Sequence, residues 1–154
     1  MARATAAAAL PALVLVLAHR SPILTAVCDE PSGVRVDLVG QTLKKGDDSF
    51  TGVKPVFISD DAKPDVLTVV WGPTKAVQDA AVPTPAIEAQ VISRIDAKIT
   101  AVRIDDAEYG VVHMYSLYPE KGLVFFTQHR YLTAAGGVPT ASTFYAKCRF
   151  SRSG

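Results

Sequence analysis

The sequence predicts an all-β fold, either an antiparallel sandwich or a small barrel of about eight short strands. Short segments in which apolar and polar residues alternate recur along most of the chain, and clusters of glycine, proline and aspartate separate them. The 154 residues carry a net charge of +1 and are 49% hydrophobic, which is typical of one folded domain. Sandwiches and barrels share this layout, so the sequence leaves both open.

The first half of the chain contains three strand patterns. In "GVRVDLVG", the apolar residues from Val34 to Leu38 repeat with a period of two. Two apolar runs, residues 56–58 and 66–71, flank the turn-forming stretch "SDDAKPD" and predict a hairpin with a longer loop. We expect three acidic pairs to lie in solvated loops: Asp47-Asp48, Asp60-Asp61 and Asp105-Asp106.

The middle of the chain is less regular. One short helix is predicted near residues 74–82, where the Thr74 hydroxyl can cap the first turn and three nearby prolines limit the length. Two strands are predicted within residues 86–104, because β-branched side chains are frequent there.

The stretch "YGVVHMYSLYPEKGLVFFTQHRYL" predicts a hairpin whose four-residue turn, "PEKG", starts with proline and ends with glycine. In this register His113 lies opposite Gln128 and His129 lies opposite Val112, so the two histidines occupy opposite faces. A turn one residue shorter would place His113 directly across from His129, because side chains alternate with a period of two. Neither face is cleanly polar, and we therefore expect both faces to be partly covered.

The only two cysteines, Cys28 and Cys148, lie near opposite ends of the chain and predict a disulfide. The bridge would close a loop of about 120 residues, for which chain entropy gives roughly 4 to 5 kcal/mol. Alternation in "STFYAKCRF" turns Cys148 toward the interior. We expect no lipid anchor on Cys28, because Val27 and Thr25 do not fit the Leu-small-small-Cys pattern of bacterial lipoproteins.

The N-terminal stretch "MARATAAAALPALVLVLAHRSP" has the plan of a secretory signal peptide, with an early arginine followed by a short apolar run. We assign residues 1–26 to this peptide, with cleavage after Ala18 or Ala26, and residues 27–154 to a single β domain. The apolar run is shorter than the roughly 20 residues that cross a bilayer, so no transmembrane span is expected in the mature chain. The lack of asparagine and the abundance of alanine indicate a GC-rich bacterial genome. Together with the signal peptide, this predicts a periplasmic or extracellular protein.

The balanced charge argues against nucleic-acid binding, which requires an excess of basic residues. The chain also lacks the G-x-S-x-G, H-E-x-x-H, P-loop and G-x-G-x-x-G patterns. An enzyme is therefore disfavoured, and we assign no cofactor and no metal.

One catalytic hypothesis remains, a metal or general-base site formed by His113, His129 and Glu108. Two imidazoles and one carboxylate can hold zinc and leave an open position, but the site needs the shorter turn. Without such a site, His129 and Arg130 are explained as strand-end residues that keep the apolar run before them soluble. Three aromatic residues are candidates for binding: Trp71, Tyr115 and Tyr118.

Three functions follow from these observations. The favoured one is a non-catalytic binding module of the periplasm or envelope, whose partner is an unidentified protein or envelope component and which should expose an aromatic patch. The first alternative is a carrier of a small apolar ligand in a barrel cavity. The second alternative is the histidine-dependent metal enzyme.

Overall fold

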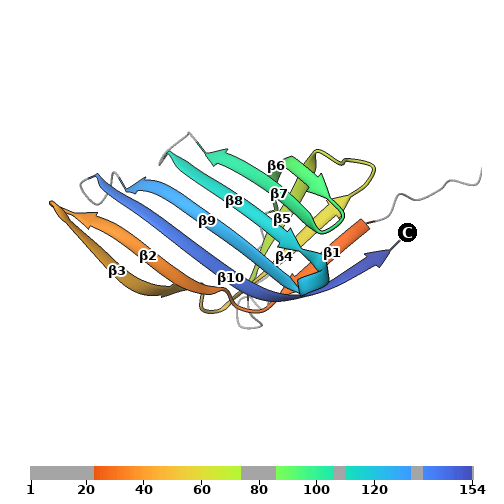
Figure 1. Cartoon of the computed structure of the whole chain (residues 1–154), viewed down its shortest axis with the longest axis horizontal. Helices are drawn as coiled ribbons and strands as arrows, with labels where there is room; N and C mark the ends of the chain where they lie inside the picture. The colour runs from red at the N-terminus through yellow and green to blue at the C-terminus, as the bar shows by residue number, and fades with distance from the viewer. Residues whose placement is uncertain (1–22, 74–85, 106–109, 133–136, 154) are drawn as a thin grey trace, which may run out of the picture.

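The structure, a computed structural model, describes residues 23–73, 86–105, 110–132 and 137–153, and it is all-β as predicted (Figure 1). One short 3-10 helix, η1 (Pro119–Lys121), connects β8 to β9. The ten strands are β1 Ile23–Cys28, β2 Ser32–Val39, β3 Thr42–Ser49, β4 Val53–Asp60, β5 Val66–Pro73, β6 Ala86–Ile95, β7 Lys98–Asp105, β8 Val111–Tyr118, β9 Leu123–Leu132 and β10 Val138–Ser153.

Eight of these strands close into an antiparallel barrel. The order is β1-β4-β5-β6-β7-β8-β9-β10, and β10 pairs back with β1 to complete the ring. The barrel alternative is therefore correct, and the closed ring contains eight strands, the number that was expected. The remaining two strands, β2 and β3, extend the sheet outside the ring.

Strand β10 joins the two parts of the sheet. Residues 138–147 pair with β9 along one edge. Along the other edge, residues 140–145 pair with β2 and residues 148–153 pair with β1. One half of β10 thus closes the barrel, while the other half carries the β2–β3 hairpin, which we call the wing (Figure 1).

The attachment of the wing to β10 depends on Gly33. A Cβ atom at this position would overlap the backbone carbonyl oxygen of Thr143 on β10. Only glycine allows the two backbones to approach this closely.

The predicted disulfide is present at the seam of the barrel. Cys28 and Cys148 lie directly opposite each other, where β1 pairs with β10. The amide of Cys148 also donates a hydrogen bond of 2.8 Å to the carbonyl oxygen of Gly122 in the β8–β9 turn. The seam is therefore fixed by a covalent bond and by contact with the turn.

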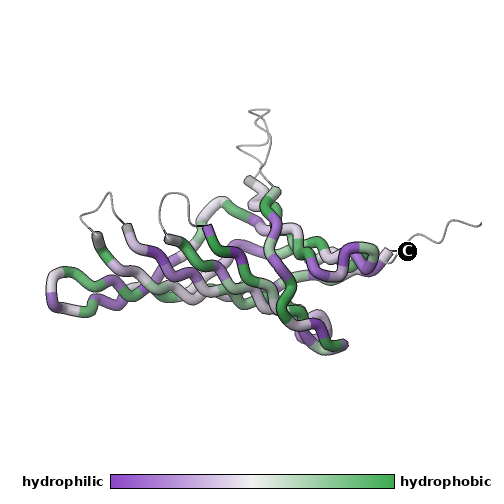
Figure 2. Tube along the Cα trace, turned by 90° about the horizontal axis from the view of Figure 1, so that it is seen from above, coloured by the Kyte–Doolittle hydropathy of each residue, from purple (hydrophilic) through white to green (hydrophobic). Residues whose placement is uncertain are grey.

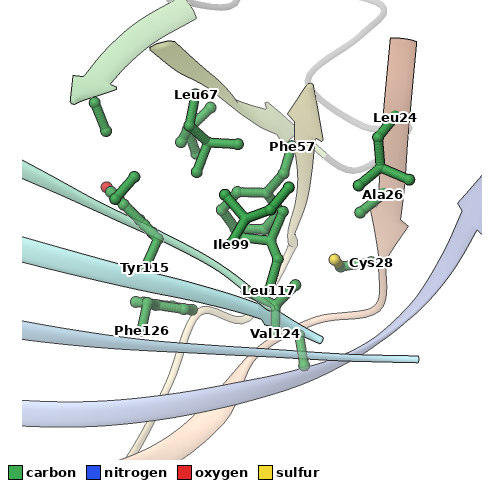
Figure 3. Close-up of a cluster of buried hydrophobic side chains, with 14 of the residues drawn as sticks. Leu24, Ala26, Cys28, Phe57, Leu67, Ile99, Tyr115, Leu117, Val124 and Phe126 are labelled. Atoms are coloured by element: carbon green, nitrogen blue, oxygen red, sulfur yellow. The ribbon is translucent and has the colours of Figure 1, made fainter. Parts of the chain in front are cut away.

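The core lies inside the ring. Figure 3 shows side chains from β1, β4, β5, β7, β8 and β9 pointing into one cluster. An eight-stranded barrel is just wide enough for side chains to fill its interior. The largest buried side chains of the cluster are Tyr115, Phe57, Phe126, Phe144, Leu67, Leu117, Val69 and Val124.

Two strands differ from the sequence-based expectation, and the first is β1. Residues 23–26, placed in the signal peptide by the sequence, pair with β4 and β10, and Ala26 is fully buried. Their short, apolar character fits an interior strand as well as the end of a leader peptide, which is why composition did not separate the two.

The second unexpected strand is β3, where the sequence predicted a loop at Asp47-Asp48. Both aspartates lie within β3 and pair with β2. A two-residue turn with Gly40 at a positive φ of 62° folds the polar segment back along β2. The Asp60-Asp61 pair does lie where β4 ends and a turn begins. The expected helix near residues 74–82 and Asp106 lie outside the described residues.

Candidate binding face

The β8–β9 hairpin has the register predicted from its four-residue turn. Tyr118 pairs with Leu123, His113 with Gln128, and Val112 with His129. Alternate residues therefore point into the barrel or away from it, and Figure 2 shows polar and apolar residues alternating along the strands. The inner residues include Tyr115, Leu117, Val124 and Phe126, all of which are buried.

This register separates the two histidines. His113 is half-buried on the inner face, whereas His129 is exposed on the outer face. Glu108 lies outside the described residues. Within the described ranges, no group of three or more histidine, cysteine or acidic side chains is arranged to hold a metal ion.

The surroundings of His113 favour its neutral form. It lies between Arg103 on β7 and Gln128 on β9. Burial lowers the pKa of His113, and the positive charges of Arg103 and Arg130 lower it further against the opposing effect of Asp105. The imidazole is therefore uncharged at neutral pH, and its ring is parallel to that of Tyr115.

Three buried polar atoms on the inner face of β8, β9 and β10 have no hydrogen-bond partner among the described residues. They are the Tyr115 hydroxyl, the Ser142 hydroxyl and Nε of Arg130. Burial also raises the pKa of Tyr115 to about 12. Buried polar groups are normally paired, so these atoms mark a place where the interior is not internally satisfied.

Aromatic rings fill the interior next to these atoms. Trp71 stacks on Phe50 at a centroid distance of 5.3 Å and meets Phe126 edge-on at 5.4 Å. Phe126 stacks on Phe144 at 4.9 Å. Two of the three aromatic residues predicted to bind, Trp71 and Tyr115, are thus part of the barrel interior, and Tyr115 is fully buried.

The third predicted aromatic residue, Tyr118, belongs to an exposed row on the outer face. Its ring meets that of Phe125 on β9 at 5.9 Å, and Phe125 lies 6.4 Å from Tyr145 on β10. Phe125 is 41% exposed and Tyr145 is 48% exposed. The rings therefore form a continuous aromatic strip across three neighbouring strands, open to solvent.

Aliphatic residues widen this strip. Val112 and Met114 on β8 and Val34 on β2 are exposed on the same side of the sheet, as is Tyr131 at the end of β9. We call the following set the outer apolar face: Val34, Val112, Met114, Tyr118, Phe125, Tyr131 and Tyr145. Both faces of the hairpin were expected to be partly covered, and the outer face carries half-buried residues beside exposed ones such as Met114 and Phe125.

No formal charge interrupts the outer apolar face on β8 and β9. The outward positions of these strands are Val112, Met114, Ser116, Tyr118, Leu123, Phe125, Thr127, His129 and Tyr131. None of them is an aspartate, glutamate, lysine or arginine. A solvent-exposed face of a sheet normally carries charged or polar residues. The fold itself does not explain why most of these outward positions are apolar.

A shallow depression lies beside the face. Its volume is about 450 Å³, and it lies between the end of β9 and the tip of the wing. Its lining is mostly apolar and includes Leu38, Leu43, His129, Tyr131 and Pro139.

Sequence reasoning identified Tyr118 but not Phe125, Tyr145 or Met114. The signal was present, because the predicted register already placed Phe125 and Met114 on the face opposite Tyr115. The sequence pattern does not indicate which of the two apolar faces points into the barrel.

Comparisons with protein-family models, with curated proteins and with solved structures find no match to this chain. In the part of the chain that the structure describes, no helix has the length and apolar character needed to span a membrane.

Proposed function

We propose that the protein is a non-catalytic binding module that docks a partner protein on its outer apolar face. The observation that carries the proposal is the aromatic strip of half-buried Tyr118 and exposed Phe125 and Tyr145 across three adjacent strands, of which β8 and β9 carry no charged residue on this face. Contiguous exposed apolar patches of this kind mark interaction sites in soluble proteins.

The composition of the face supports a protein partner. The centres of protein interfaces are enriched in tyrosine, phenylalanine and methionine and depleted in charged residues. Aromatic side chains provide large contact areas and lose little conformational freedom on binding. The complementary surface should accordingly be largely apolar, with a few polar groups that can bond to Ser116 and Thr127 within the face.

We further propose that the module is exported by a bacterium. The cysteine pair supports this, because disulfides persist in oxidising compartments. Cleavage after Ala18 fits the fold better than cleavage after Ala26, which would remove residues 23–26 and hence most of β1. The mass of the mature protein should therefore correspond to a chain that begins at His19.

Site-specific photo-crosslinking in the cells that produce the protein tests the docking surface. A photoreactive amino acid is placed at Phe125 or Met114 on the outer apolar face, and at Lys54 on β4 as an exposed control. The proposal predicts the same crosslinked protein from positions 125 and 114, and none from position 54. Equal products from all three positions, or products from none, would contradict it.

A second candidate, a carrier of a small ligand with a polar end, is favoured by one observation on the inner face. The Tyr115 hydroxyl, Ser142 hydroxyl and Arg130 Nε are buried and unpaired among the described residues, and polar groups of a bound ligand could satisfy them. Native mass spectrometry of the exported protein tests this candidate. An added mass of a few hundred daltons that Ser142→Ala removes would favour the carrier.

A further inference from the structure

Strand β3 is the open edge of the wing. It ends the strand order of the sheet, and in the described part of the chain it pairs only with β2 (Figure 1). Residues 42–47 are all exposed. An unpaired edge presents free amide and carbonyl groups that another strand can use.

The hairpin geometry identifies which backbone groups are free. In a two-residue hairpin the residues that flank the turn, here Val39 and Thr42, form a hydrogen-bonded pair. Hydrogen-bonded and non-hydrogen-bonded pairs then alternate along an antiparallel ladder. The amide and carbonyl groups of Leu43, Lys45 and Asp47 consequently point away from β2, toward the open edge.

The charges along this edge are arranged symmetrically. The segment "KKGDD" has two lysines before Gly46 and two aspartates after it. Among the described residues, Lys44, Lys45 and Asp47 take part in no ion pair, and Asp48 makes a single contact of 3.8 Å with Arg35. The edge therefore carries a charge pattern that is complementary to itself when read in the opposite direction.

We propose that two copies of the chain pair through β3, antiparallel, about a two-fold axis that passes through Gly46 at right angles to the sheet. Lys45 then lies opposite Asp47 of the second copy, and Lys44 lies opposite Asp48 of the second copy. Each pair occurs twice because of the symmetry. The free backbone groups of Lys45 and Asp47 meet their counterparts, so hydrogen bonds and charge pairs form in the same register.

The neighbouring symmetric registers are unfavourable. With a two-fold axis normal to the sheet, residues that lie opposite each other point to the same face. The axis must therefore pass through a residue of β3, and each alternative register places it at a different residue. Centring on Lys45 places the two copies of Lys45 against each other, and centring on Asp47 does the same for Asp47. Like charges directly opposite destabilise a strand pair, so Gly46 is the preferred centre.

Single charge reversals test the pairing, measured by analytical ultracentrifugation of the full mature protein from about 1 to about 500 micromolar. The unmodified protein should dimerise. Lys45→Glu and Asp47→Lys should each weaken the dimer at least about tenfold, because each replaces opposite charges by like charges at two symmetric positions. Lys121→Glu and Asp96→Lys, the same changes at exposed turns outside the wing, should leave dimerisation unchanged.

The decisive sample is an equimolar mixture of the two reversed variants. In the mixed dimer the new carboxylate at position 45 faces the new ammonium at position 47, and the opposite pair keeps its original charges. The mixture should recover the dimerisation that each variant alone has lost in part. A monomeric unmodified protein over the whole range, or a mixture no more associated than its components, would overturn the proposal.

Discussion

The two faces of the β8–β9 hairpin are equally apolar but have opposite surroundings. Phe126 points inward and is 2% exposed, whereas its neighbour Phe125 points outward and is 41% exposed. The inner ring packs against Phe144, Trp71 and Tyr115 inside the barrel. The outer ring meets the rings of Tyr118 and Tyr145 on the solvent-facing strip.

This difference separates residues that the fold requires from residues that it does not. The barrel interior explains why the inner face is apolar, since burial of aromatic side chains supplies much of the folding free energy. The same explanation does not apply to the outer face, which stays in contact with solvent. This difference is the basis for the proposal that the apolar residues there are a contact surface for another molecule.

The largest expected change in stability comes from replacing Phe126 by alanine, and the adjacent Phe125 provides the comparison. Phe126→Ala should lower the free energy of unfolding by about 3 to 5 kcal/mol, because it removes a fully packed ring from the core. Phe125→Ala should lower it by less than about 1 kcal/mol, because only contacts on the exposed strip are lost. Urea unfolding of both variants checks the contrast, and similar losses would mean that the outer face is part of the core.

The disulfide should have the next largest effect. Replacing both Cys28 and Cys148 by alanine should lower the free energy of unfolding by about 2 to 5 kcal/mol, because the seam between β1 and β10 loses its covalent constraint. Thermal unfolding of this double variant, compared with the oxidised protein, measures the loss. An unchanged midpoint would show that hydrogen bonding and packing alone hold the barrel closed.

Removing the Tyr115 hydroxyl should increase stability, in contrast to the two preceding substitutions. It is buried without a partner among the described residues, so Tyr115→Phe should raise the free energy of unfolding by about 1 kcal/mol. Denaturant titration measures this gain. A clear loss of stability would indicate that the hydroxyl has a partner, such as a bound water or ligand.

The smallest expected effect concerns pH. The pKa of His113 is lowered from 6.5 in the folded protein, so the unfolded chain takes up the proton more readily. The stabilising contribution of the neutral imidazole is complete above about pH 6.5 and is lost as the pH falls through the lowered pKa. Between about pH 7.5 and about pH 5, the unmodified protein should therefore lose more stability than His113→Gln. Equal losses in thermal unfolding would contradict this description of the inner face.

Much of this architecture could be predicted from local patterns. The alternation in residues 111–118 and 123–132, together with the "PEKG" turn, was sufficient to predict the hairpin register residue by residue. The even pair of cysteines was sufficient for the disulfide. Both features depend on short-range geometry or on a simple count, and sequence reasoning handles such features well.

Features decided by tertiary context could not be predicted. β3 has no apolar alternation and forms because a tight turn places it against β2. β1 resembles the end of a leader peptide, and only its pairing with β4 and β10 identifies it as a strand. The exposure of Phe125 and Tyr145 likewise depends on which face the barrel encloses, and alternation alone does not specify the enclosed face.

The most direct test of the docking face is the yield of a photo-crosslink in two backgrounds. The photoreactive residue is placed at Met114, first in the otherwise unmodified protein and then in a variant with Phe125→Ser and Tyr145→Ser. The two serines should abolish the crosslink to the partner, while the free energy of unfolding changes by less than about 2 kcal/mol for the two exposed substitutions together. An undiminished crosslink in the stable double variant would contradict the claim that the outer apolar face binds a partner.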